Sequence, residues 1–149
     1  MGIDGAELRA GLAKTAPFLL SHHLPAERHR CYAPVIFGKR RHICARCLGI
    51  YPGIAIGVLA HVLFAPVAYD FLLVLVLPLP ALVDWTVTTF TARAGSNSVR
   101  TTTGLALGFA YGQGLSLLFL AGDIRILAVG ATYALAAGVL LVVDRRGVG

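Results

Sequence analysis

The sequence carries little charge. Only 13% of its 149 residues are Asp, Glu, Lys or Arg, whereas 57% are hydrophobic and the mean hydropathy is +0.77. Soluble domains usually have about a quarter of their residues charged. This scarcity of charge excludes an ordinary soluble domain and predicts an integral membrane protein in contact with membrane lipids.

Acidic residues and cysteines are scarcer still, with seven acids against 13 Lys and Arg, and only three cysteines. The basic residues stand at the ends of apolar runs without interleaved aromatics, so no nucleic-acid partner is expected. Three cysteines are too few for a secreted disulfide framework, and a set facing the cytosol would stay reduced. An N-terminus with acids and only a short apolar stretch predicts no cleavable signal peptide.

Four apolar stretches of roughly 18 to 22 residues are long enough to cross a hydrocarbon core as helices. The connections within the first pair and within the last pair are short. We therefore expect an all-α fold, a transmembrane bundle of four helices in two hairpins over residues 47–144. The expected spans are 48–65, 71–90, 103–121 and 124–143.

The other segments are expected to be cytoplasmic. Residues 1–46 would form an amphipathic surface helix, capped by Asp4 and kinked at Pro17, followed by a Cys/His loop. Residues 145–149 would form a short tail. Twelve of the 13 Lys and Arg residues fall in these segments, beside them or between the second and third spans, and only Arg125 is left for the other side. The positive-inside rule then places both termini on the cytoplasmic side of the cell membrane.

Glycines recur every fourth residue in the first and third spans. The two stripes are Gly49, Gly53 and Gly57, and Gly104, Gly108 and Gly112. Such stripes let two helices approach closely in lipid. They predict helix packing, with a hint of a parallel repeat of hairpins, and a homo-oligomer that associates through the same stripes.

The three cysteines lie close together with histidines around them. Tetrahedral zinc prefers four sulfur or nitrogen ligands. Cys31, Cys44 and Cys47 would supply three, and one of His22, His29 or His42 the fourth, with His22 our choice. A lone C-x-x-C pair also serves redox chemistry, and plain cysteines at an interface are the third reading.

Asp84 is the acid that lies deep in an apolar stretch, about six residues or roughly 9 Å from the cytoplasmic end of its helix. Just before it, Pro78 and Pro80 remove backbone donors and predict a kink. A carboxylate at that depth is costly, so it is normally paired, protonated or functional. Asp84 is thus the leading functional residue, and the alternative is a structural ion pair with Arg46 or Arg100.

The loop between the second and third spans is polar. Thr101 or Thr102 is expected to cap the third helix, where free N–H groups and Arg100 would make either an anion site or a plain capped turn. His61, at the far end of the first span, is expected to be an interfacial side chain.

These motifs together resemble a family of membrane proteins called domain of unknown function two-zero-eight-five. The similarity covers roughly residues 21 to 115, and its most specific part is the C-A-R-C-x-G-I-Y block from Cys44 to Tyr51. The family's first block resembles C-H-Q-x-P, where this chain has Ser21 and His23. The resemblance implies a membrane location and a shared cytoplasmic motif, and no activity. The matching polar positions are His22, Cys44, Cys47, Asp84, Asn97 and Arg100.

Three functions remain open from the sequence. The first is a zinc-supported site acting on a lipid or lipid-linked phosphate, in a cavity just inside the membrane ringed by Arg46, Asp84, Asn97 and Arg100. There Arg46 and Arg100 would bind the anion, and Asp84 would be the base or a second metal ligand. The second is a transporter of a small ion or metabolite, centred on Asp84 and the broken second helix. The third is a non-catalytic membrane subunit or assembly factor whose metal loop binds a soluble partner.

Overall fold

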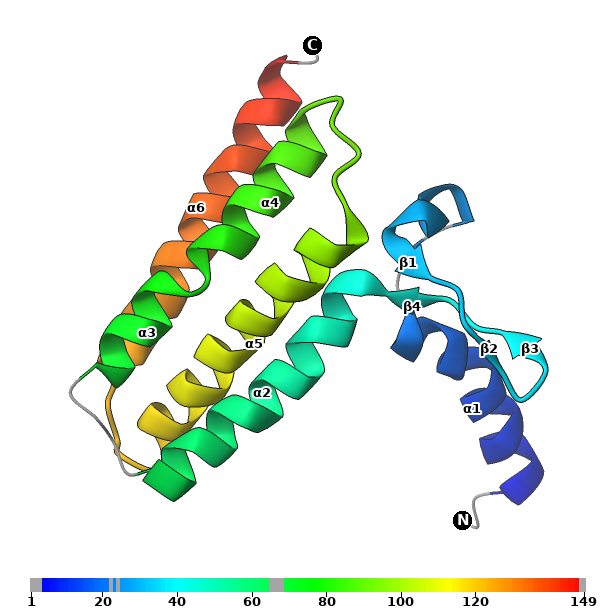
Figure 1. The fold of residues 1–149 in the computed structure, drawn as a ribbon, viewed down its shortest axis with the longest axis horizontal. Coiled ribbons are helices and arrows are strands. Elements are labelled where there is room, and N and C mark those ends of the chain that lie inside the picture. The colour runs from blue at the N-terminus through cyan, green and yellow to red at the C-terminus, as the bar shows by residue number, and fades with distance from the viewer. Residues whose placement is uncertain (1–3, 22, 24, 65–68, 148–149) are drawn as a thin grey trace.

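The computed structural model describes residues 4–21, 23, 25–64 and 69–147, which are mostly helical (Figure 1). An N-terminal arm contains helix α1 (Gly5–Leu20), the 3-10 helix η1 (Pro25–Arg30) and the strands β1 (Cys31–Tyr32), β2 (Val35–Ile36), β3 (Lys39–Arg40) and β4 (Ile43–Cys44). The bundle that follows comprises α2 (Ala45–Phe64), α3 (Asp70–Val76), α4 (Leu79–Phe90), α5 (Asn97–Phe119) and α6 (Arg125–Gly147).

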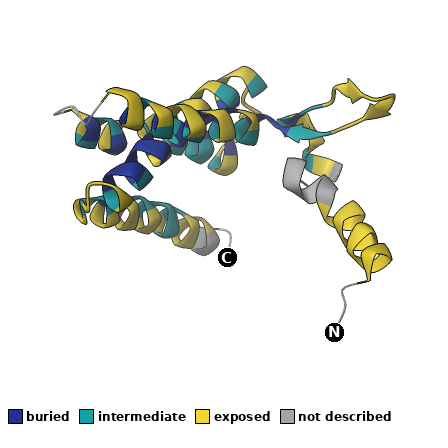
Figure 2. Cartoon of the chain, turned by 90° about the horizontal axis from the view of Figure 1, so that it is seen from below, coloured by how far each residue is buried: buried dark blue, intermediate teal, exposed yellow. Residues whose placement is uncertain are grey.

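The arm is more ordered than the expected loop. β1 pairs antiparallel with β4, and β2 pairs with β3 in a hairpin. As predicted, Asp4 caps α1, because its Oδ1 accepts a hydrogen bond from the Ala6 N–H at 2.9 Å. The arm projects from the end of the bundle where α2 begins, and most of its surface is exposed (Figures 1 and 2). Whether α1 lies on the membrane surface stays a prediction.

Three segments of the described chain are long and apolar enough to cross a membrane: Ala45–Phe64, Asp70–Phe90 and Arg125–Asp144. They correspond to the first, second and fourth expected spans. α5 has 23 residues but is not among them. Its first two turns carry Asn97, Ser98, Arg100 and three threonines, which lower its hydropathy. The four-helix membrane bundle is therefore not confirmed by length and composition.

The second span is broken, as its prolines predict. α3 ends at Val76 and α4 begins at Leu79, with Pro78 at the position before α4. Pro78 and Pro80 have no N–H group to bond back to the preceding turn. Leu77 and Pro78 at the junction have helical dihedral angles, and α4 follows α3 along the same side of α5 (Figure 1).

The most extensive contact in the bundle joins α2 to α5, which run in the same direction. Each glycine of one stripe faces backbone of the other helix. A Cβ atom on Gly53 would lie 2.5 Å from the Leu105 carbonyl oxygen, and one on Gly104 would lie 2.5 Å from the Arg46 carbonyl oxygen. The prediction that the stripes pack helices is confirmed. Because they are used within one chain, oligomerisation through them stays a prediction.

The arrangement differs from the expected pair of hairpins. α5 lies between α2 and the α3–α4 segment, so α2 does not pack mainly on its sequence neighbour (Figure 1). The reason is that both stripes of small residues belong to α2 and α5, and backbone contact in lipid is available only there. α6 packs at its first half, where Val129 joins Val74 and Leu117 in a buried cluster.

The N-terminus of α5 also corrects a prediction. Its cap is Ser96, whose Oγ accepts from the Val99 N–H at 3.3 Å, and not Thr101 or Thr102. All three threonines that follow donate to helix carbonyls instead, and Thr101 also donates to the Ala45 carbonyl at 2.9 Å. The cap comes earlier because Ser96 has extended backbone, as a cap requires.

A methyl group at the glycine interface should be costly. We expect Gly53→Ala to lower the free energy of unfolding by about 1–3 kcal/mol through overpacking. Gly130→Ala in α6 is the matched control, since a Cβ there meets no atom within 4 Å and Ala favours helix over Gly by about 1 kcal/mol. Thermal unfolding in detergent, followed by circular dichroism, would measure both. Equal midpoints for the two variants would contradict the interface.

Candidate functional site

An ion pair stands at the end of the bundle where α2 begins. Arg46, in the first turn of α2, donates from Nη2 to Asp84 Oδ2 in the middle of α4. The Asp84 side chain is 7% exposed and that of Arg46 is 22% exposed. The sequence left open whether Asp84 pairs with Arg46 or with Arg100, and the structure places it with Arg46.

Arg100 and Asn97 form a separate network one helix turn apart on α5. Arg100, which is 3% exposed, donates to Asn97 Oδ1 at 3.2 Å and to the Ala94 carbonyl. The Asn97 amide in turn donates to the His29 carbonyl at 3.1 Å and weakly to the Cys31 carbonyl at 3.4 Å. These bonds tie the arm to the start of α5. Catalytic roles for Asp84, Arg46, Arg100 and Asn97 stay predictions.

Positive charge is in excess around this end. The Arg30 guanidinium contacts α4 weakly, with its Nη2 atom 3.4 Å from the Thr88 carbonyl oxygen. Its Nη1 atom lies 3.6 Å from Oε1 of Glu27. Arg100 lies within electrostatic range of Arg30, Arg46 and Asp84. The three guanidinium groups of this end, those of Arg30, Arg46 and Arg100, are therefore balanced by two carboxylates. These are the buried one of Asp84 and the more exposed one of Glu27. Among the described residues, the Nε atoms of Arg30 and Arg46 are also buried without a hydrogen-bond partner. Both features suit an anion at this place.

An apolar groove of about 680 Å³ opens between α3–α4, α5 and α6. Arg46 is the charged residue that lines it, and Trp85, Tyr111 and Tyr133 are the aromatic ones. On α5 the lining runs from Leu107 to Leu118, which is eleven steps of helix or about 16 Å. Volumes of 300–1,000 Å³ are typical of ligand sites. The groove is therefore long, apolar and cationic at one end.

Asp84 does not line the groove that Arg46 lines. It lines a second groove of about 700 Å³ between α4 and the start of α5, together with Thr88, Arg93 and Ser96. The Arg46–Asp84 pair thus offers its guanidinium to one groove and its carboxylate to the other. The sequence predicts a single cavity ringed by Arg46, Asp84, Asn97 and Arg100, whereas the structure places Arg46 on one groove and Asp84 on another. The difference arises because both grooves depend on how α6 and α4 pack against α5.

The cysteines gather where the arm meets α2. Cys31 and Cys44 are buried and face each other across the β1–β4 ladder, and Cys47 follows in the first turn of α2. The His23 Nε2 atom lies 3.3 Å from Cys44 Sγ, and the Ser21 hydroxyl lies 3.2 Å from Cys31 Sγ. None of the three cysteines forms a disulfide. His22, the fourth ligand chosen from the sequence, lies outside the described residues.

The arrangement is not that of a formed metal centre. Within the described part of the chain, no group of three or more Cys, His, Asp or Glu side chains is placed to hold a metal ion. One edge does fit. Zinc bonds of about 2.3 Å to sulfur and 2.0–2.1 Å to nitrogen put two tetrahedral ligands about 3.6 Å apart, close to the 3.3 Å between His23 and Cys44. His23 is not among the three histidines that the sequence suggested as the fourth ligand.

A second polar cluster lies at the opposite end of the bundle. His61 of α2 is 6% exposed, so the expectation of an interfacial side chain was wrong. Its Nδ1 lies 3.2 Å from Gln113 Oε1 on α5 and 3.7 Å from Asp70 Oδ2 on α3. The sequence signal was the set of polar residues in otherwise apolar helices, but their pairing depends on the packing of three helices.

Comparison with known proteins identifies a family and no characterised relative. A family model described as predicted membrane protein, DUF2085, matches residues 28–113, more than half of the chain. No curated protein and no solved structure matches the chain. The matched region contains α2 to the middle of α5, and with them Arg46, Asp84 and both glycine stripes.

Removing either partner of the ion pair should leave a buried charge. We expect Asp84→Asn and Arg46→Gln each to lower the free energy of unfolding by about 2–4 kcal/mol, with the double variant no worse than the worse single one. Asp123→Asn is the control, because its pair with Arg125 is exposed at the arginine and should change little. Unfolding in mixed micelles would give the double-mutant cycle, and additive losses would show that Arg46 and Asp84 do not interact.

Proposed function

Since the chain belongs to the DUF2085 family of predicted membrane proteins, we propose that it is a multi-pass membrane protein that binds a lipid with an anionic head group. The observation that carries this is the groove of about 680 Å³, which is apolar along its length and has Arg46 as its charged residue. An apolar chain would fill the length of the groove, and a phosphate-bearing head group would meet the guanidinium.

The position of Asp84 favours binding over catalysis. A lipid in the groove would meet Arg46, while the carboxylate of Asp84 lines the other groove. Asp84 then acts by holding the guanidinium in place. Chemistry on the lipid would need a proton acceptor on the Arg46 side, and the proposal does not include one.

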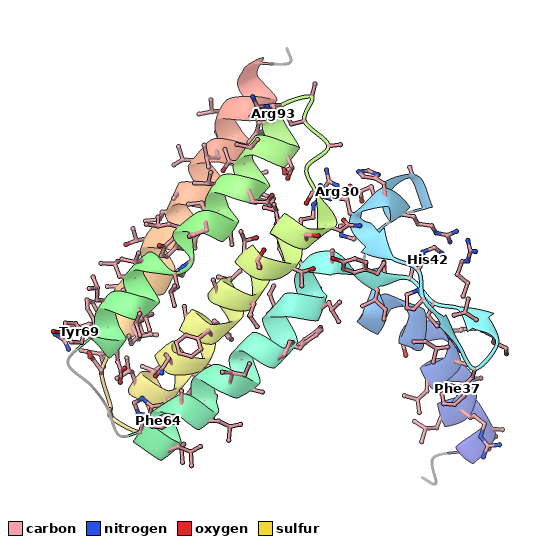
Figure 3. The ribbon with its side chains drawn as sticks, viewed as in Figure 1. Arg30, Phe37, His42, Phe64, Tyr69 and Arg93 are labelled. Carbon is pink, nitrogen blue, oxygen red and sulfur yellow. The ribbon has the colours of Figure 1, made fainter. Side chains whose placement is uncertain are left out.

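We also propose that α5 is a fourth spanning helix. Its 23 residues reach about 35 Å, more than the roughly 30 Å of a hydrocarbon core. It lies between α2 and α3–α4, both of which are apolar enough to span. Its polar first turns lie beside Arg30, at the end of the bundle that also carries Arg93 (Figure 3). The positive-inside rule then puts that end, with both termini, in the cytoplasm.

The single tryptophan, Trp85, lines the groove and can report on its occupant. We expect an anionic lipid with brominated chains to quench Trp85 at a lower mole fraction than a brominated zwitterionic lipid in mixed micelles. Arg46→Gln should abolish this preference, because the guanidinium is lost, while Arg28→Gln on the exposed face of η1 should keep it. Equal quenching by the two lipids in the wild type would refute the proposed head-group site.

A second pair of variants separates occupancy of the groove from contact with the surrounding lipid. Gly130 lines the groove and Gly138 does not, and a Cβ at either glycine meets no atom within 4 Å. Gly130→Leu should reduce quenching of Trp85 by both lipids, since its side chain would occupy the groove. Gly138→Leu should leave quenching unchanged. Identical curves for the two variants would mean that the lipid reaches Trp85 by another route.

A second candidate function is zinc binding where the arm meets α2, with Cys31, Cys44, Cys47 and His23 as ligands. The contact between His23 and Cys44 favours it, and the site would clasp the arm to the bundle. We expect about one zinc ion per chain by elemental analysis, lost in Cys44→Ser/Cys47→Ser and in His23→Ala. If His23→Ala keeps its zinc and His22→Ala loses it, then the fourth ligand is His22. A wild-type protein without zinc would refute the zinc site.

A further inference from the structure

The β2–β3 hairpin presents a fully exposed aromatic side chain at its tip. Phe37 is fully exposed, at 101% of its reference area, and its neighbours Val35 and Ile36 are 67% and 39% exposed. Figure 3 shows Phe37 on the arm, away from the bundle. Exposed apolar groups gathered at one tip mark an interaction surface rather than a folded core.

The backbone at the tip sharpens this point. Phe37 and Gly38 form the two-residue turn, with φ angles of +49° and +72°. Turns with both central residues at positive φ favour Asn-Gly or Gly-Gly, because a bulky side chain is strained there. Gly38 suits its position and Phe37 does not. Phe37 makes no compensating contact with the described part of the chain, so its exposed and strained position points to a contact with something outside the chain.

The basic residues beside the tip indicate which kind of surface Phe37 contacts. On the returning strand Lys39 and Arg40 lie opposite Ile36 and Val35, and Arg41 follows, all three exposed. No acidic residue occurs between Glu27 and Asp70. An apolar tip followed by three consecutive cationic residues is complementary to an anionic lipid surface. There, aromatic side chains enter the interfacial region, and Lys and Arg contact the phosphates.

The chain also keeps the tip close to the bilayer. β4 leads directly into α2, which is apolar and long enough to span. From Phe37 to Ala45 there are eight steps of chain, so the tip is held within about 26 Å of the start of α2. We propose that the β2–β3 hairpin inserts Phe37 into the surface of the membrane that α2 crosses and that Lys39, Arg40 and Arg41 make this contact selective for anionic lipid.

The test is a tryptophan placed at the tip. The Phe37→Trp/Trp85→Phe variant of the full chain would be reconstituted in nanodiscs of phosphatidylcholine alone or with phosphatidylglycerol, each with and without bromine on the acyl chains. In the anionic nanodiscs we expect emission at shorter wavelength than in the zwitterionic ones and loss of most of the emission in brominated lipid. Adding Lys39→Gln, Arg40→Gln and Arg41→Gln should return both signals to the zwitterionic level.

Two results would overturn the inference. Emission typical of water, with no quenching in either nanodisc, would place the tip in solvent and point to a soluble protein partner instead. Equal quenching in both nanodiscs, unaffected by the Gln substitutions, would reject the role of the basic residues. Both substitutions exchange one aromatic side chain for another, at the exposed Phe37 and at the half-buried Trp85, and the circular dichroism of the variant should match that of the wild type.

Discussion

The backbone contact between α2 and α5 is the constraint on which the rest of the bundle depends. In lipid, side chains gain little by burying themselves against one another, so helices associate where their backbones can come close. The six glycines provide such a surface along three turns of each helix, and a single Cβ would collide with the facing carbonyl. Because the helices are parallel, both begin at the same end. Arg46 and Arg100 are brought together there, along with the positive ends of two helix dipoles.

That convergence explains why Asp84 is where it is. Two helix N-termini and three guanidinium groups in a low-dielectric environment repel one another unless an acid is near. The break at Pro78 allows α4 to run toward this end while α3 stays packed at the other, and Asp84 then meets Arg46. The proposed anionic ligand rests on the positive charge that remains at this end.

Much of this could be predicted from the sequence, for physical reasons that also set the limit. Three of the four long apolar runs, the proline break, the glycine stripes and the Asp84–Arg46 alternative are local or periodic signals that the structure bears out. The order of the helices could not be predicted, since which stripe meets which depends on competition among all the helices. The cap at Ser96 was missed because three threonines farther along gave the same local signal. The hairpin and the contact of His23 with Cys44 required short-range pairing that residue types alone do not specify.

The two polar clusters at the ends of the bundle make its first half rigid. Arg46 and Asp84 join α2 to α4 at one end, and His61 with Asp70 and Gln113 joins α2, α3 and α5 at the other. Breaking such contacts in an apolar environment is costly. α6 is tied to α3, where the Tyr133 hydroxyl donates to the Leu75 carbonyl and the Arg125 guanidinium lies 4.8 Å from the centre of the Phe71 ring. Only 6% of the apolar window of α6 is buried. One wall of the large groove therefore carries Arg46, which Asp84 holds in place, while the α6 wall is held by Tyr133, Arg125 and the apolar cluster around Val129. In the proposed lipid complex, the head group would meet a guanidinium that is already in position.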